Sequence, residues 1–211
     1  RNPLSYYCEN KSCSPEGLKL LIKAHPDDDR GAKNEDAIKS SKRNPLSYYC
    51  ENESSSKDGI KVLIDAYPKG VTNKDGTYKR NPLSHYCENK KCSPEGMKVL
   101  VEREGYKGAN NEDFWFHRNP LSHYCANESC TPQGIRVLIE AHKKIDEDQD
   151  TGVTNEEKEE KKTPLTYYCQ NHSCTSEGVK LLLDAHPFTS IENENLISCY
   201  TASYPYVFYE G

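Results

Sequence analysis

The chain has 211 residues, and its 28 lysine and arginine residues are outnumbered by 33 aspartate and glutamate residues. The basic residues are dispersed among the acidic ones, so the sequence lacks the basic stripe that is typical of nucleic-acid-binding proteins, and we expect no nucleic-acid partner. No apolar run approaches the length of a membrane-spanning helix, so we also expect no membrane span.

One eight-residue phrase recurs five times and divides the chain into units. It reads RNPLSYYC, RNPLSYYC, RNPLSHYC, RNPLSHYC and KTPLTYYC, beginning at Arg1, Arg43, Arg80, Arg118 and Lys162. Successive copies start 42, 37, 38 and 44 residues apart, and periods in this range are typical of stacked repeat proteins. We therefore divide the chain into repeats over 1–42, 43–79, 80–117, 118–161 and 162–187, followed by a non-repeating aromatic tail over 188–211.

Each unit carries the signals for two short helices. An asparagine or threonine that can cap a helix precedes the proline of each phrase, and proline is tolerated at the first helical position. A second set of hydroxyl caps follows at Ser14, Ser56, Ser93, Thr131 and Thr175. Beyond the first of these, Leu18, Leu21 and Ile22 have the i, i+3, i+4 spacing of an amphipathic helix. One such helix pair cannot bury its apolar stripe alone, so we expect neighbouring units to stack.

The phrases NPLS.YC and EG.K.LI.A.P resemble the ankyrin repeat, whose first helix reads T-P-L-H-x-A and whose period is about 33 residues. The resemblance covers essentially the whole chain. It implies an all-α, ankyrin-type helix-turn-helix solenoid whose long connections form fingers, for which a β-hairpin is one form. Tyrosine replaces the small alanine of the family at Tyr7, Tyr49, Tyr86, Tyr124 and Tyr168. We interpret the glycines early in the second helices as the partners that make room for these rings, at Gly17, Gly59, Gly96, Gly134 and Gly178.

Cysteines in four of the five units follow a C-x4-C spacing. The pairs are Cys8 with Cys13, Cys87 with Cys92, Cys125 with Cys130, and Cys169 with Cys174. On one interpretation the first cysteine of each pair is a small buried apolar side chain and the second is incidental. On the other, each pair is a disulfide that joins the two helices and stabilises the fold by about 2 kcal/mol. One unit offers too few ligands for a closed zinc site, so we expect no metal there.

The turn between the helices carries the acceptor pattern for N-linked glycosylation in four units. The candidate residues are Asn10, Asn52, Asn127 and Asn171. We expect this turn to be an exposed loop, as such acceptors require. The acceptors and the paired cysteines favour a secreted, extracellular location, whereas a cytoplasmic location is the alternative because ankyrin-type proteins are mostly intracellular.

Two sets of aromatic side chains are candidates for partner binding. The first set occupies one equivalent position in each unit, at Tyr6, Tyr48, His85, His123 and Tyr167. The ankyrin resemblance implies that this position faces the concave surface, where the rings would form a ladder of interface anchors; the alternative is that they pack on one another. The second set lies in the third connection, at Phe114, Trp115 and Phe116, and is either a binding hot spot or the packing between adjacent fingers.

The fourth connection partly matches the template of a calcium-binding loop. Four acidic residues match positions 1, 3, 5 and 12 of the calcium-loop template, at Asp146, Asp148, Asp150 and Glu157. Thr151 stands where the template needs glycine, so we favour a solvated acidic loop and expect no metal.

No catalytic constellation emerges from the sequence. The histidines of the phrase stand two residues before a cysteine on a short helix, which points the two side chains in different directions. The sequence therefore predicts a non-enzymatic scaffold for protein–protein interaction, without a cofactor, that binds another protein or a copy of itself. The alternative is a self-assembling structural subunit of a larger, extracellular filament or complex.

Overall fold

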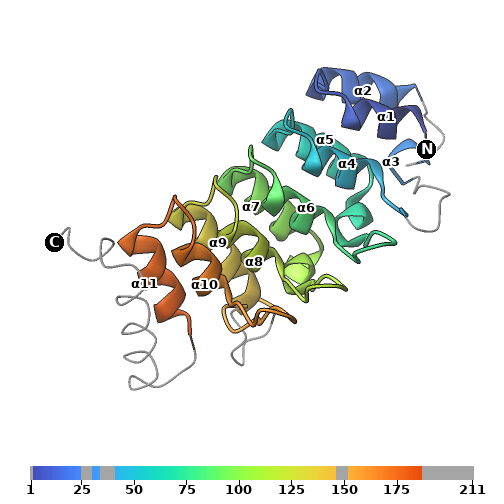
Figure 1. Ribbon diagram of the computed structural model, residues 1–211. Coiled ribbons are helices and arrows are strands. Elements are labelled where there is room, and N and C mark those ends of the chain that lie inside the picture. The colour runs from blue at the N-terminus through green and yellow to red at the C-terminus, as the bar shows by residue number, and fades with distance from the viewer. Residues whose placement is uncertain (1, 25–29, 34–40, 146–151, 187–211) are drawn as a thin grey trace.

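A computed structural model describes residues 2–24, 30–33, 41–145 and 152–186. Pairs of helices stack along one axis, from α1 and α2 at one end to α10 and α11 at the other (Figure 1). Within the described ranges every element is helical and no residue lies in a β-strand. The all-α solenoid predicted from the repeats is therefore confirmed, whereas the aromatic tail over 188–211 lies outside the described residues.

Each repeat contributes two helices joined by a short turn. The first helices are α1 (Pro3–Glu9), α4 (Pro45–Glu51), α6 (Pro82–Glu88), α8 (Pro120–Cys125) and α10 (Pro164–Cys169). The second helices are α2 (Pro15–Lys23), α5 (Lys57–Ala66), α7 (Pro94–Glu102), α9 (Pro132–Lys143) and α11 (Ser176–Asp184). A short third segment, which the sequence analysis did not predict, follows in three repeats as α3 (Arg30–Lys33) and the 3₁₀-helices η1 (Pro68–Thr72) and η2 (Arg103–Asn110).

Side-chain caps begin the helices as predicted. In the third repeat, Asn81 Oδ1 accepts the N–H of Ser84 at 2.9 Å, and Ser93 Oγ accepts the N–H of Gly96 at 3.2 Å. Every first and second helix has an equivalent cap bond. The amide of Asn81 also donates to the carbonyl of Gly108 at 2.8 Å. One capping residue thus satisfies a helix start and ties the third segment to the first helix.

The predicted packing of tyrosine against glycine is confirmed in every repeat. A β-carbon added to each of these glycines would lie about 2 Å from the tyrosine hydroxyl, closer than any real contact. The pairs are Tyr7 with Gly17, Tyr49 with Gly59, Tyr86 with Gly96, Tyr124 with Gly134, and Tyr168 with Gly178. Glycine therefore occupies these positions because the ring of the preceding helix fills the space.

A column of asparagines joins each repeat to the one before it. Asn89 Nδ2 donates to the carbonyls of Cys50 at 2.8 Å and Asn52 at 2.7 Å, and its Oδ1 accepts the N–H of Lys91 at 2.8 Å. Asn52, Asn127 and Asn171 make the equivalent bonds. These side chains satisfy carbonyls at the ends of the first helices, so the asparagine column sets the register between repeats.

Candidate interaction surface

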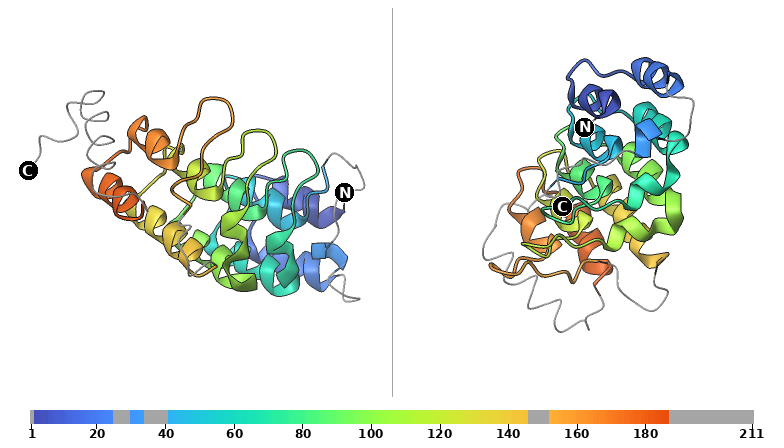
Figure 2. Two further views of the ribbon diagram at one scale, coloured as in Figure 1. Left: turned by 90° about the horizontal axis from the view of Figure 1, so that it is seen from below. Right: turned by 90° about the vertical axis from the view of Figure 1, so that its right-hand side faces the viewer.

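Three connections form fingers that stand side by side along one side of the solenoid (Figure 2). They cover residues 74–80, 112–118 and 156–162. The N–H of Asp75 donates to the carbonyl of Arg80 at 2.9 Å, and that of Asp113 to the carbonyl of Arg118 at 3.0 Å. Each finger is therefore a tight closed turn, and not the β-hairpin considered from the sequence. The residue before the closing position has a positive φ, at Lys79, His117 and Lys161.

Buried carboxylates hold the base of each finger. Asp113 Oδ1 accepts the N–H of Phe116 at 2.7 Å, and its Oδ2 lies 3.1 Å from His123 Nε2 and 3.4 Å from an amino group of Arg80. Burial alone would raise the pKa of Asp113, but the bonds from His123 and the Phe116 N–H outweigh it and lower the pKa. The carboxylate therefore stays charged and anchors the finger to helix α8.

Neighbouring fingers are also bonded to one another through their backbones. The N–H of Phe114 donates to the carbonyl of Tyr78 at 2.7 Å, and the N–H of Lys158 donates to the carbonyl of Phe116 at 3.0 Å. Because each finger is closed internally and bonded to its neighbour, the row of fingers presents side chains from a fixed backbone.

The predicted ladder of rings is not an exposed surface in most repeats. Tyr6 is 61% exposed, but the four later rings are no more than 7% exposed, at Tyr48, His85, His123 and Tyr167. The fingers cover this position: His85 Nε2 lies 3.1 Å from Asp75, and the guanidinium of Arg118 stacks on Tyr167. The expectation that these rings bind a partner directly is therefore wrong for the four buried residues, and it stays a prediction for Tyr6.

The buried histidines act instead as anchors for the fingers. Burial lowers the pKa of His85 below its ordinary value, although the hydrogen bond to Asp75 opposes the shift. His123 lies between two carboxylates, with Nδ1 3.0 Å from Glu88 and Nε2 3.1 Å from Asp113. The carboxylates belong to a finger and to the preceding first helix, so His123 links three structural segments.

Apart from Tyr6 on helix α1, the large exposed aromatic side chains of the described residues lie on the fingers. Phe114 is 59% exposed, Trp115 is 55% exposed and Tyr78 is 38% exposed. The rings of Phe114 and Trp115 meet edge to face, with their centroids 5.4 Å apart. Phe116 is half-buried, with the guanidinium of Arg118 5.0 Å from its ring centroid. We call Tyr78, Phe114 and Trp115 the finger-tip aromatic group.

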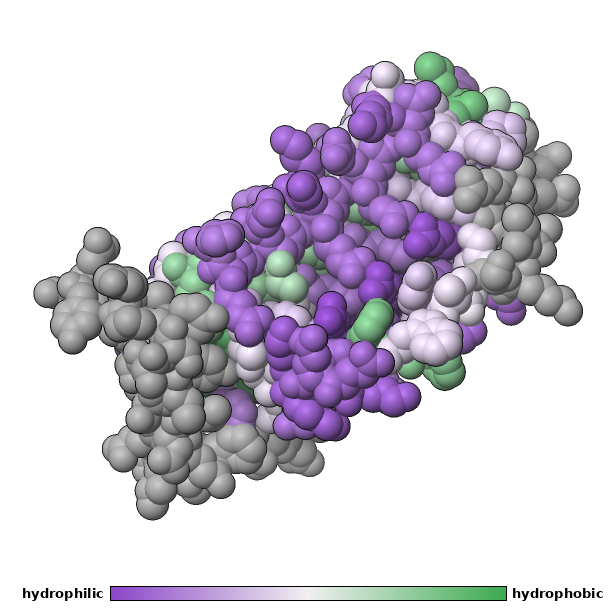
Figure 3. Space-filling view, in the orientation of Figure 1, coloured by the Kyte–Doolittle hydropathy of each residue, from purple (hydrophilic) through white to green (hydrophobic). Residues whose placement is uncertain are grey.

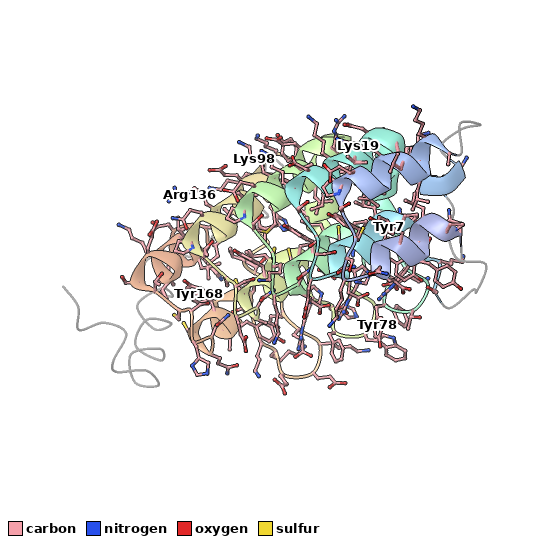
Figure 4. All side chains as sticks on the ribbon, turned by 90° about the horizontal axis from the view of Figure 1, so that it is seen from above. Tyr7, Lys19, Tyr78, Lys98, Arg136 and Tyr168 are labelled. Atoms are coloured by element: carbon pink, nitrogen blue, oxygen red, sulfur yellow. The ribbon has the colours of Figure 1, made fainter. Side chains whose placement is uncertain are left out.

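The hydropathy of the surface differs between the second helices and the fingers. Figure 3 shows mostly hydrophilic residues along the second helices, with paler and more apolar residues beside the fingers. Tyr78 lies on the opposite long side of the solenoid from Lys19, Lys98 and Arg136 (Figure 4). Because the N–H of Phe114 is bonded to the carbonyl of Tyr78, the finger that carries Phe114 and Trp115 lies beside Tyr78.

The cysteines that were candidates for disulfides lie close together in pairs. The nine cysteines within the described residues carry free thiols. In the third repeat, burial raises the pKa of Cys87 well above its ordinary value, and a hydrogen bond with Cys92 adds to the shift. Bridge formation by the four pairs therefore stays a prediction.

Three of the four candidate glycosylation sites serve the asparagine column. Asn52 and Asn127 are buried and Asn171 is half-buried, and the Nδ2 atom of each donates to two carbonyls of the preceding repeat. A glycan on that nitrogen is incompatible with keeping both bonds, so these three asparagine side chains are not freely exposed as expected, although the residue after each one is exposed. Asn10 is exposed, and its glycosylation stays a prediction.

Only one of the four candidate calcium ligands lies within the described residues. Asp146, Asp148 and Asp150 lie outside the described residues, whereas Glu157 is buried and accepts the N–H of Glu160 at 2.8 Å. Glu157 therefore anchors the third finger, as Asp113 anchors the second. Across the described ranges, no group of three or more histidine, cysteine or acidic residues could hold a metal ion, and no helix there is long and apolar enough to cross a membrane.

No protein-family model matches the chain, and no curated protein matches it either. Among solved structures, the chain is similar to the ankyrin repeat domain of Bcl-3, described as a unique member of the IkappaB protein family. The two have a TM-score of 0.61 and 16% sequence identity, and the match covers 88% of this chain and 72% of the other. The chain therefore has the ankyrin-repeat fold, as the repeated phrases predicted.

Proposed function

We propose that the chain is a non-enzymatic scaffold that binds another protein through the finger-tip aromatic group. The observation that carries this proposal is the exposure of Phe114 and Trp115 at 59% and 55% on a finger with a fixed backbone. Aromatic side chains dominate interface hot spots because they bury a large area and lose little side-chain entropy. Grouped large aromatics on a hydrophilic surface are typical of a contact site.

The anchoring of the fingers supports the same conclusion. Asp113 and the bond between Phe114 and Tyr78 order the second finger before any partner arrives. Binding through a segment that is already ordered costs less conformational entropy than binding through a flexible loop. The histidines beside carboxylates, which would be the first candidates for catalysis, are buried and hold fingers in place, which favours a scaffold over an enzyme.

Site-specific photo-crosslinking tests this proposal. A photoreactive phenylalanine analogue replaces Trp115 in one variant and Lys98, on the opposite long side of the solenoid (Figure 4), in the matched control. We expect crosslinks to a second protein from position 115 and few from position 98. Crosslinks only between copies of the chain would identify the self-assembling subunit instead. Equal crosslinking from both positions contradicts the proposal.

A quantitative comparison then follows with the identified partner. The double variant Phe114→Ala with Trp115→Ala should weaken binding by about tenfold or more, because each anchor is worth on the order of 1–2 kcal/mol. Both side chains are exposed, so thermal unfolding should change little. A large loss of stability would show that these rings belong to the packing between fingers.

A further inference from the structure

The arginine that begins the repeated phrase takes a carboxylate partner in two repeats. Arg43 pairs with Glu51, and Arg80 pairs with Glu88 at 2.8 Å. In both cases the glutamate lies eight residues later, at the end of the first helix. A second amino group of Arg80 lies 3.4 Å from Asp113. In both repeats, therefore, the arginine at this position binds a carboxylate.

The fourth repeat lacks this carboxylate. Ala126 stands eight residues after Arg118, where the other two repeats have glutamate. Among the described residues, no ion pair joins Arg118 to a carboxylate; its buried Nε atom has no hydrogen-bond partner, a feature that it shares with Arg80. Glu160, on the next finger, is ion-paired with Lys162. The guanidinium of Arg118 is thus left without the anion that Arg43 and Arg80 bind.

Two aromatic rings nevertheless hold Arg118 in place. Its guanidinium carbon lies 4.6 Å from the ring centroid of Tyr167 and 5.0 Å from that of Phe116. These cation–π contacts hold the guanidinium beside the rings but supply no anion, so its N–H donors can still bind a carboxylate in a bidentate manner.

A cavity of about 330 Å³ adjoins this guanidinium and is lined by Arg118, Ala126, His123, Glu88, Lys90 and Glu128. Glu88 is held by Arg80 at 2.8 Å and by His123 at 3.0 Å. Lys90, Arg118 and Glu128 have no ion-pair partner among the described residues. The unpaired guanidinium of Arg118 and the absence of a glutamate side chain at Ala126 favour one added carboxylate.

We propose that this cavity binds an aspartate or glutamate side chain of the partner protein, which supplies the carboxylate that Ala126 does not. This inference rests on the proposed function and names the chemistry of the partner at the same surface. Phe116 precedes Arg118 by two residues and follows Trp115 directly. The partner segment is therefore one that places an apolar side chain against the finger-tip aromatic group and an acidic side chain beside Arg118.

A random peptide library selected on the full wild-type chain provides the probe for this site. The affinity of each selected peptide is measured for wild type, Trp115→Ala, Arg118→Gln, Ala126→Glu and Arg136→Gln. The last variant is the matched control, because Arg136 carries the same charge and lies on the long side of the solenoid opposite Tyr78 (Figure 4). Ala126→Glu retains the arginine and places a carboxylate at the spacing that Glu51 and Glu88 use, so it closes the site from within the chain.

We expect the selected peptides to be enriched in acidic residues. They should bind Arg118→Gln and Ala126→Glu with an affinity at least about tenfold lower than that for wild type, because removing one member of a desolvated charge pair has an effect of this size. Arg136→Gln should bind as wild type does. Changing the acidic residue of a peptide to its amide should abolish the difference between wild type and Ala126→Glu. Thermal unfolding of Ala126→Glu should be unchanged or occur at a higher temperature, because the new pair is internal.

The outcomes separate this inference from the proposed function. Peptides whose binding is weakened by Trp115→Ala but not by Ala126→Glu, or that lack acidic enrichment, would overturn the carboxylate site and leave the scaffold proposal standing. Peptides that bind without any dependence on Trp115 would contradict both.

Discussion

The hydroxyl of Tyr86 lies where a β-carbon on Gly96 would have to stand, at a separation of only 2.2 Å. The same hydroxyl accepts the N–H of Ser93 at 3.2 Å, so the ring of helix α6 also fixes the first turn of helix α7. Glycine near the start of a helix costs propensity, and alanine there would be favoured by up to about 1 kcal/mol if space allowed. The recurrence of the pair in all five repeats shows that packing outweighs that cost.

Gly96→Ala is therefore expected to lower the free energy of unfolding by about 1–3 kcal/mol, because the new methyl group must displace the buried ring of Tyr86. Urea denaturation followed by circular dichroism measures this change. Lys98→Ala, at an exposed position in the same helix, is the matched control and should have little effect. A more stable Gly96→Ala variant would show that the ring yields without cost.

The asparagine column predicts that replacing Asn89 destabilises the fold more than replacing Asn10, the equivalent residue of the first repeat. Asn89→Ala removes donors from the carbonyls of Cys50 and Asn52 and an acceptor from Lys91, so unpaired groups are left between repeats. We expect it to destabilise the fold by about 2–4 kcal/mol. Asn10→Ala is the control: Asn10 is exposed in the first repeat, and among the described residues its side chain accepts only the N–H of Ser12. The expected loss there is about 1 kcal/mol or less, and equal losses in the two variants would rule out the column as the link between repeats.

Contacts within a repeat could be predicted from the sequence, whereas contacts between repeats could not. Tyr86 and Gly96 belong to one helix pair, so their complementary sizes are visible in the repeated phrase. The cover over His85 comes from Asp75, in the connection before it, and the connections share little sequence. For this reason the sequence predicts an exposed ladder of rings, although the rings after Tyr6 are buried.

The cavity beside Arg118 also could not be predicted from the sequence alone. The spacing between Arg80 and Glu88 and the substitution of Ala126 are both present in the sequence. Their meaning depends on a side-chain contact between the base of a finger and the end of a helix, which spacing alone does not reveal. The repeated arginine and glutamate at eight-residue separation is the signal that could have identified it.

The burial of His85 predicts a loss of stability in weakly acidic solution. Burial lowers its folded-state pKa, against the opposing effect of Asp75, so the unfolded chain binds a proton there that the folded chain does not. The free energy of unfolding should therefore decrease as the pH falls through the unfolded pKa of about 6.5 towards the lower folded value. The lowered pKa of Asp75 contributes a further loss only around pH 4 and below, where its unfolded-state carboxyl group becomes protonated.

Comparison with His85→Gln isolates this effect, because glutamine can still donate to Asp75 but does not titrate in this range. Urea midpoints measured between about pH 7.5 and pH 5.5 should fall less steeply for the variant than for wild type. His123 and His142 are present in both proteins, so their contributions cancel in the comparison. Parallel curves would show that His85 titrates alike in the folded and unfolded chains.

The cysteines predict an order of chemical reactivity in the reduced protein. The hydrogen bond with Cys169 lowers the pKa of Cys174, although burial opposes this, and the side chain is half-buried. Burial raises the pKa of Cys50 and Cys87 well above the ordinary value. Because the thiolate is the reactive form, brief alkylation near pH 8 should modify Cys174 first and these two last, as peptide mass spectrometry can establish. Equal labelling in the native state would contradict this order, and an intact mass two hydrogens lower per pair before reduction would show that the predicted bridges form.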